Sequence, residues 1–407
     1  MNVRSAKETD LQRIAEVGVK SFPRRTVQER LERLLNETRY GPSDILVCEE
    51  DGDIVGCATL IPQKVWLGGD EYESGGIASV AVEPHCRRRG VAKDIMQGAL
   101  DHMRSRSIPF SMLHPFRNTF YRNYGYGLVG QTVEFACSPS HIPFFPEARS
   151  VRPIKPKDQD DLLKFYDGWL PTQNLRIHRS SRRWEQILFR DNNHFYLFRN
   201  TQGRIEGYLC YKYERCADAP ASTINVGDFV ATSPEAQRAL YGFLSAQTDQ
   251  IASIRMVQPI GTSLPFLLAE PRGARFPWGE VAVGRLHSSF MLKILEPERC
   301  FSGKRNFNGH TGALGITIMP STHDVEKEKS FAVEFTDGAA SVVKATPAAK
   351  SSLKTSTSVF ANLITGVLHT SDACVFGLAD VDRPETAAAL DRAFKTAPPY
   401  QPDIDYF

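Results

Sequence analysis

A short pattern of residues recurs about 150 positions apart in this chain of 407 residues. The spacing VRxxKxxD of residues 3–10 returns at residues 151–158, and each copy precedes a helical pattern. Farther along, residues 80–84 (VAVEP) are matched by residues 230–234 (VATSP). Two matches in the same order and at nearly the same offset predict a duplicated domain, so the chain is expected to fold as two related units and a remainder.

The first copy alternates short apolar runs with one long amphipathic stretch. An Asp-Gly pair at residues 51–52 predicts a hairpin turn between two strands. Residues 91–107 are expected to form a helix with Ile95, Ala99 and Met103 on one face. Strands are expected over residues 2–6, 44–50, 54–62, 74–83, 108–115 and 131–137. The predicted fold class is therefore α/β (α+β), with antiparallel pairing at the centre of the sheet.

Changes of composition divide the chain further. Residues 138–150 are rich in Pro and Ser and have no clear period, which predicts a linker. After about Gly284 the pattern changes to strands, with an Asp-Gly turn at 337–338, and then to helices expected over residues 351–368 and 383–396. The expected domains cover residues 1–138, 150–285 and 286–407, and the third is an α+β domain.

Bulk composition excludes several classes of protein. The formal net charge of +2 gives no general case for nucleic-acid binding. None of the eight cysteines forms a CxxC pair and no His cluster accompanies them, so neither a metal site nor a disulfide framework is expected. The N-terminus lacks the apolar region of a secretory signal, and no run approaches the roughly 18 apolar residues of a membrane helix. A cytoplasmic protein without membrane or nucleic-acid partners is expected.

Residues 79–96, SVAVEPHCRRRGVAKDIM, place three arginines and a glycine between a strand and a helix. The first N–H groups of a helix are unpaired and carry partial positive charge, so this junction suits a phosphate. If the strand at Val80 and Val82 separates from its neighbour, its backbone can also pair with an amide-bearing ligand. Coenzyme A has both amides and a pyrophosphate. A solvated basic helix start and a nucleic-acid patch are the other interpretations. The second copy has QRAL at residues 237–240, without a glycine, and is not expected to hold an anion.

V-x-V followed by R-x-x-G-x-A resembles the acetyl-CoA signature of the GCN5-related N-acetyltransferases (GNAT). FYRNYGYG, residues 120–127, resembles the segment of that family in which a tyrosine stands beside the thioester sulfur. The whole chain, which ends in Asp-Tyr-Phe, resembles the enhanced intracellular survival (Eis) family of these enzymes. The resemblance implies tandem GNAT-like domains, the second without a phosphate loop, and then a domain like a sterol carrier protein. It also implies acetyl-CoA as co-substrate and assembly as a hexamer.

The resemblance assigns roles to individual residues. Tyr121 corresponds to the general acid, and the carboxylate of Phe407 to a general base. Phe22 corresponds to an aromatic residue of the amine pocket. The residues expected to hold acetyl-CoA are Val80, Val82, Arg87, Arg88, Gly90, Val91, Ala92 and Asn118. The implied function is transfer of an acetyl group to a primary amine, which could belong to an aminoglycoside, a polyamine or a lysine side chain.

Two positions depart from the aminoglycoside-modifying members, in which acidic residues follow the phenylalanine and precede the terminal one. Here Arg24 and Tyr406 occupy these positions, although Asp403 and Asp405 lie near enough in sequence to compensate. A pocket for a polycation favours negative charge, so the identity of the amine stays open. Two other functions are left open as well: a non-catalytic acetyl-CoA-binding regulatory protein, and a carrier of lipid or another apolar ligand through the C-terminal domain.

Overall fold

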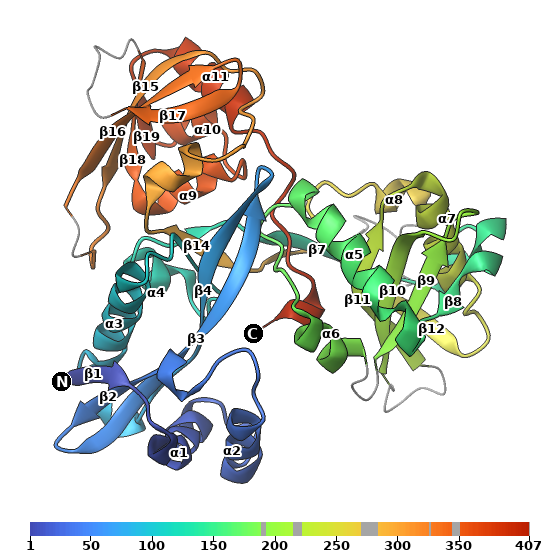
Figure 1. Cartoon of the computed structure of the whole chain (residues 1–407), viewed down its shortest axis with the longest axis horizontal. Helices are drawn as coiled ribbons and strands as arrows, with labels where there is room; N and C mark the ends of the chain where they lie inside the picture. The colour runs from blue at the N-terminus through green and yellow to red at the C-terminus, as the bar shows by residue number, and fades with distance from the viewer. Residues whose placement is uncertain (189–192, 215–221, 270–283, 325–326, 344–350, 407) are drawn as a thin grey trace, which may run out of the picture. The chain divides into compact units, whose positions relative to one another are not determined.

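The computed structural model describes residues 1–188, 193–214, 222–269, 284–324, 327–343 and 351–406 (Figure 1). The chain divides into two compact units. The first unit comprises residues 1–129 and 290–397, and the second comprises residues 130–289 and 398–406. No helix among the described residues is long and apolar enough to cross a membrane.

The first unit contains a seven-stranded sheet in the order β1-β2-β3-β4-β5-β14-β6. All neighbouring strands are antiparallel except β4 and β5, which are parallel. The strands are β1 (Asn2–Ser5), β2 (Ile45–Glu50), β3 (Asp53–Leu67), β4 (Asp70–Val82), β5 (Phe110–Leu113), β14 (Met291–Ile294) and β6 (Gly127–Leu128). The helices that accompany them are α1 (Leu11–Ser21), α2 (Val27–Leu35), α3 (Val91–Ser105) and α4 (Asn118–Arg122).

Local sequence signals account for much of this sheet. Asp51 and Gly52 both have positive φ, of 52° and 85°, and form the predicted turn between β2 and β3. The predicted face of α3 is confirmed, because Ile95, Ala99 and Met103 are all buried against the sheet. Burial of this apolar face is the main source of the helix's stability.

The strands β4 and β5 separate along their length. Their pairing ends at Ile77 and Leu113, whereas β4 continues to Val82. At the same point β4 carries a bulge against β3, and Ser79 takes a positive φ of 54°. Bulges bend a strand and increase its local twist. The backbone of β4 beyond Ile77 therefore lacks a strand partner on its β5 side.

The second unit repeats this strand order. Its seven-stranded sheet runs β13-β7-β12-β11-β10-β9-β8, and again only one neighbouring pair, β11 and β12, is parallel. The strands are β7 (Gln131–Cys137), β8 (Arg152–Pro153), β9 (His194–Arg199), β10 (Ile205–Glu214), β11 (Ser222–Ala231), β12 (Ile251–Pro259) and β13 (Arg285–Ser288). Its helices are α5 (Gln159–Trp169), α6 (Ser181–Leu188), α7 (Pro234–Ser245) and α8 (Leu264–Leu267). The matching order agrees with the predicted duplication.

The two copies exchange one strand. β7 follows the first copy in sequence but lies between β12 and β13, and β14 follows the second copy but lies between β5 and β6. The boundaries expected at residues 138 and 286 would assign β7 to the first domain and β14 to the third. Residues 138–150, expected as a linker, contain two 3-10 turns, η4 (Pro139–His141) and η5 (Pro146–Ser150), and η5 packs on α7.

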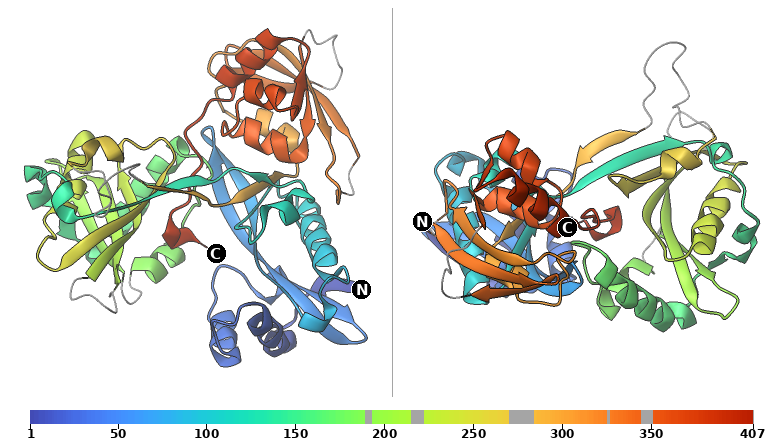
Figure 2. Two further views of the ribbon diagram at one scale, coloured as in Figure 1. Left: turned by 180° about the vertical axis from the view of Figure 1, so that it is seen from behind. Right: turned by 90° about the horizontal axis from the view of Figure 1, so that it is seen from above.

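A five-stranded sheet, in the order β17-β16-β15-β18-β19, forms the rest of the first unit. Its strands are β15 (Gly312–Met319), β16 (Lys329–Thr336), β17 (Ala339–Val343), β18 (Ser351–Ser356) and β19 (Ala379–Val381). Figure 2 shows α9 (Thr357–Ile364), α10 (Thr370–Val375) and α11 (Pro384–Ala393), in orange to red, on one face of this sheet. The single helix expected over 351–368 is wrong. Residues 351–356 alternate in burial as a strand, and Ser356 then caps α9 by accepting from the N–H of Val359.

Candidate active site

The free edge of β4 is the first component of the site. Val80 and Val82, both expected to bind the ligand through their backbone, lie on β4 beyond the point where β5 separates. The N–H of Val82 donates to Ser21 Oγ at 3.3 Å, a long hydrogen bond. Unpaired strand backbone next to an opening can bind an extended, amide-bearing ligand by strand addition.

The loop between β4 and α3 supplies an anion-binding geometry. Arg88 and Gly90 both take positive φ, of 63° and 96°, and turns of this kind form concavities of backbone N–H groups that bind anions. A Cβ built on Gly90 meets nothing within 4 Å, so the space in front of the helix start is open. The N–H groups of Val91 and Ala92, in the first turn of α3, have no intrahelical acceptor.

The three arginines of this loop differ in their partners. Arg89 forms an ion pair with Glu50 at 2.8 Å, so its charge is offset. Arg87 donates to the backbone oxygen of Lys20 at 3.1 Å. Neither Arg87 nor Arg88 pairs with a carboxylate of the described residues. The two arginines expected to hold the pyrophosphate are therefore the two whose charges are available to an anion.

Tyr121 lies on α4 in an aromatic environment. Its ring contacts those of Phe116, Phe120 and Tyr126, with centroids 5.0 to 6.1 Å apart. Tyr121 also belongs to the hydrophobic cluster that contains Ile77 and Leu113, the last paired residues of β4 and β5. The structure thus brings Tyr121 to the point where the two strands diverge.

Burial raises the pKa of Tyr121 above its ordinary value, so its phenol is protonated at neutral pH. No described residue forms a hydrogen bond with its hydroxyl group. Tyr126, which burial also shifts upward in pKa, uses its hydroxyl group in a 2.6 Å hydrogen bond with Ser111. Burial raises the pKa of Tyr124 to about 12. Asn118, at the first position of α4, is partly buried and lies three residues from Tyr121.

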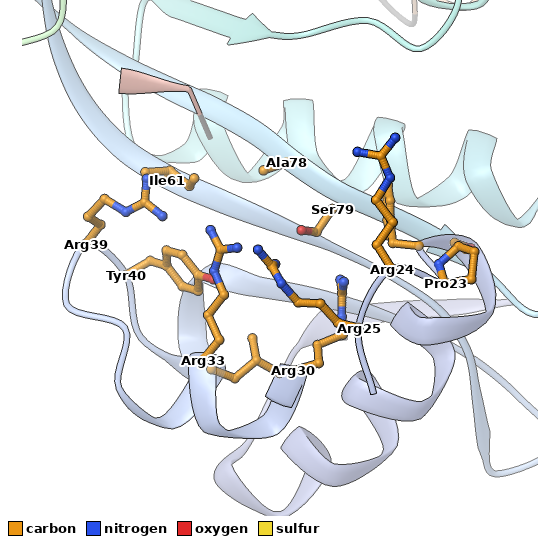
Figure 3. A pocket seen from close by; sticks show the side chains of 13 residues that line it. Pro23, Arg24, Arg25, Arg30, Arg33, Arg39, Tyr40, Ile61, Ala78 and Ser79 are labelled. Atoms are coloured by element: carbon orange, nitrogen blue, oxygen red, sulfur yellow. The ribbon is translucent and has the colours of Figure 1, made fainter. Parts of the chain in front are cut away.

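A cavity of about 620 Å³ opens beside the bulge of β4 (Figure 3). Its strand side is formed by Ile61, Ala78 and Ser79. Its other side comes from α2 and the loops around it. These residues are Ser21, Phe22, Pro23, Arg24, Arg25, Arg30, Arg33, Leu34, Arg39 and Tyr40. The structure therefore places Phe22 in a cavity that reaches the residue preceding Val80.

The sequence reasoning identified only one of the five arginines that line this cavity, Arg24. The pair at residues 24–25 and the i, i+3 spacing of Arg30 and Arg33 were visible signals, because residues three apart share a face of a helix.

No carboxylate among the described residues lines the cavity. Glu83 directly follows β4, and its buried side chain forms ion pairs with Arg13 at 2.8 Å and Lys20 at 2.9 Å. Burial alone would raise the pKa of Glu83, but Lys20 and Arg13 outweigh it and lower the pKa. Glu83 is therefore a stably ionised structural group that positions the end of β4.

The C-terminal tail is fixed within the second unit. Both oxygens of Asp405 accept hydrogen bonds from Arg179 at 2.7 to 3.1 Å, and both side chains are buried. The backbone N–H of Tyr400 donates to Asn174 O, and its hydroxyl group donates to Val257 O at 2.9 Å. The tail is thus ordered as far as Tyr406, and Phe407 lies outside the described residues. Asp405 cannot supply the negative charge expected of it in an acceptor pocket, because Arg179 neutralises it.

This tail meets the second unit where β11 and β12 diverge, which corresponds to the opening between β4 and β5. The β11–β12 pairing ends at Val226 and Met256, and Tyr400 bonds to the next residue of β12. The helix that follows β11, α7, begins with Pro234, and its cap Ser233 accepts from Ala236 N and donates to Glu206. Its N-terminus is therefore already capped and lies beside a carboxylate, which explains why this copy would not hold an anion.

Acid unfolding should depend on Asp228, which is buried between Arg176 and Arg179. Burial alone would raise the pKa of Asp228, but the two guanidinium groups lower it to about 2. An unfolded Asp has a pKa of about 3.9, so the stabilisation is complete above pH 4 and is lost as pH falls through 2. Between pH 5 and pH 2, the free energy of unfolding in urea should fall about 2 kcal/mol further in the wild type than in Asp228→Asn. Parallel acid profiles would contradict the lowered pKa.

Comparisons with known proteins agree with this geometry. Two family models, each described as an acetyltransferase (GNAT) domain, match residues 2–129 and 175–294. The first match ends where the chain leaves the first sheet. An uncharacterized N-acetyltransferase of Streptomyces avermitilis is 24% identical over 68% of this chain and 69% of its own length.

Two further proteins match nearly the whole chain. The N-acetyltransferase Eis of Mycobacterium tuberculosis is 21% identical over 90% of each chain. The fold of a GCN5-related N-acetyltransferase from Anabaena variabilis superimposes with a TM-score of 0.85, 18% identity and complete coverage of both chains. The chain is therefore an N-acetyltransferase of the GCN5-related family, with two tandem GNAT domains, and is Eis-like within that family.

Proposed function

We propose that the first GNAT domain transfers an acetyl group from acetyl-CoA to a primary amine. The observation that carries this proposal is the divergence of β4 from β5 beside the open, positively charged start of α3. Backbone groups of Val80 and Val82 are the proposed partners of the pantetheine amides. Arg87, Arg88 and the N–H groups at the start of α3 hold the phosphates, and Asn118 is a further polar contact.

The proposed reaction includes two proton transfers, one to the departing sulfur and one from the attacking nitrogen. The amine nitrogen forms a bond to the acetyl carbon, and the carbon–sulfur bond breaks. Tyr121 donates its phenolic proton to the departing thiolate. Because the pKa of Tyr121 is raised, the phenol is protonated before the carbon–sulfur bond breaks. The amine attacks in its neutral form and loses one proton to a base; the base then releases this proton to solvent, and Tyr121 regains a proton from solvent.

We assign the base to the terminal carboxylate of Phe407. Two observations support the assignment: no carboxylate of the described residues lines the cavity, and Glu83 is held in two ion pairs. A carboxylate can remove the proton directly or through a water molecule.

The proposal predicts amine-dependent release of thiol from acetyl-CoA. A panel of aminoglycosides, polyamines, lysine peptides and small anionic amines is offered to the untagged protein, and free thiol is measured. At least one amine should give turnover, and removal of Phe407 should lower kcat for that amine about 100-fold. Binding of acetyl-CoA without turnover for any amine would overturn the proposal and favour a regulatory protein. Full turnover without Phe407 would overturn only its role as base.

The remaining expectations from the resemblance concern the five-stranded domain. We propose that it keeps a sterol-carrier-like architecture and that the chain assembles as a hexamer. Exposed apolar side chains of Val375, Phe376 and Leu378, on and after α10, support the second point, because such patches mark interaction surfaces.

A further inference from the structure

The cavity beside β4 has an unusual charge for the amine-binding site of an acetyltransferase. Five arginines line it, and its described lining contains no Asp or Glu (Figure 3). A protonated amine approaching alone would meet only like charge, which is unfavourable even in a partly solvated site. The net charge of +2 for the whole chain shows that this concentration is local.

Arg30 lies in the wall of the cavity with an unsatisfied donor. Its guanidinium group lies over the ring of Phe22, 5.3 Å from the centroid, and its Nε is buried without a hydrogen-bond partner. It also packs on Gly18 of α1, where a Cβ would come within 2.0 Å of Nε. Burial lowers the pKa of Arg30, so the protein gives up solvation energy to hold this charge here.

Arg33, one helical turn farther along α2, has no carboxylate partner among the described residues. Burial and the nearby charge of Arg25 lower its pKa. Arg39 differs from both, because Glu37 accepts from its Nε and Nη2 at 3.0 and 2.8 Å and offsets its charge. The positive charge that no described carboxylate offsets therefore belongs to four arginines of the lining, Arg24, Arg25, Arg30 and Arg33. Like charges held together without counterions destabilise the wall, and an anion would relieve this.

From this geometry we infer that the acceptor is a primary amine that also carries an anionic group, a phosphate or a carboxylate. The inference rests on the proposed function and names its substrate class. The amine lies at Ser79, beside the β4 opening, and the anion at Arg30 and Arg33. Guanidinium groups bind both anions through paired N–H donors. A volume of about 620 Å³ suits a small molecule.

The first experiment compares amines in matched pairs: glucosamine 6-phosphate with glucosamine, phosphoethanolamine with ethanolamine, and 4-aminobutyrate with butylamine. Spermidine and kanamycin are included as polycations. The anionic member of at least one pair should have kcat/KM about 100-fold higher than its neutral partner, and the preference should weaken with added salt. The first two pairs test phosphate and the third tests carboxylate.

Variants then test whether the preference for anionic amines depends on the arginines of the cavity. Arg33→Glu and Arg30→Gln should raise the KM of the anionic amine at least about 10-fold and leave the KM of acetyl-CoA within about twofold. Arg149→Glu, an exposed arginine of η5, makes the same charge change outside the cavity and should alter neither constant. Equal use of neutral and anionic partners, or preference for polycations, would overturn the inference. A rise confined to the KM of acetyl-CoA would also overturn it, because the arginines would then serve the coenzyme.

Calorimetry separates this inference from the proposed function. Phosphoethanolamine and 4-aminobutyrate are titrated into the wild type and Arg33→Glu without acetyl-CoA, at low and high salt. At least one should bind the wild type and bind the variant at least about 10-fold more weakly. Such binding without thiol release would contradict the proposed acetyl transfer and leave the anion site standing. Turnover of neutral amines without binding of either anionic amine would support the proposed acetyl transfer and contradict the anion site.

Discussion

Replacing Tyr121 with phenylalanine is expected to lower kcat about 100- to 1,000-fold, which is the usual contribution of a positioned general acid. The KM of acetyl-CoA should change little, because the ring and its contacts with Phe116, Phe120 and Tyr126 remain. The free energy of unfolding should also change by less than about 0.5 kcal/mol, since the hydroxyl group has no hydrogen-bond partner among the described residues. Thiol release at saturating substrate and urea unfolding check both parts.

Two neighbouring tyrosines provide matched controls. Tyr126→Phe loses a 2.6 Å hydrogen bond to Ser111, whose hydroxyl group keeps its 3.3 Å bond to Gly75 O, so it should cost about 1 kcal/mol of stability. Tyr124→Phe should change stability little. Both variants should keep kcat within about tenfold of the wild type. A kcat for Tyr121→Phe that matches these controls would make Tyr121 a core residue of the aromatic cluster.

The pH dependence follows from the environment of Tyr121. Burial raises the pKa of its phenol, so the acid form is present at every pH below that value. The kcat profile should therefore show no loss from Tyr121 between pH 6 and pH 9. An activity that falls with an apparent pKa in this range would belong to another group, or would show that the phenol is not the acid.

Local features of this fold could be predicted from the sequence because their causes are local. The turn at Asp51 and Gly52 needs positive φ at both positions, and the apolar face of α3 needs only a helical period. The motif at residues 120–127 singled out Tyr121 for its chemistry, and the structure packs its ring in one cluster with the last paired residues of β4 and β5. The strand–helix division near Ser356 was missed, because β-branched and small residues there fit either period until packing selects one.

Two features could not be predicted because they depend on contacts between residues that are distant in sequence. These are the exchange of β7 and β14 between the two copies and the cavity lined by five arginines. β7 and β14 each pair with strands that are distant in sequence, so the choice of sheet depends on the tertiary fold. Arg30 and Arg33 resemble the solvated face of any surface helix. Only their position opposite Ser79, together with the lack of a carboxylate in the described lining, makes them a possible binding surface.

The buried ion pair of Asp405 with Arg179 holds the C-terminal tail in place, and its loss should lower both the stability of the protein and kcat. Asp405→Asn keeps the shape of the side chain but removes its charge from a buried pair with Arg179, whose remaining partners are Asp228 and the hydroxyl group of Tyr208. Breaking one side of a buried ion pair leaves an uncompensated charge, so the free energy of unfolding should fall by about 3 kcal/mol. Asp403→Asn, two residues away and exposed, should change it by less than about 0.5 kcal/mol.

Activity in the same variants distinguishes anchoring from general destabilisation. Phe407 follows Asp405 by two residues, so a loosened tail should present its carboxylate less often and kcat should fall at least about tenfold. Removal of Phe407 alone should lower kcat without the stability loss. Tyr400→Phe, which deletes the bond to Val257 O, should have a smaller effect of about 1 kcal/mol and an intermediate kcat. If Asp405→Asn loses stability but keeps full kcat below its unfolding transition, the tail stabilises the second unit and the base lies elsewhere.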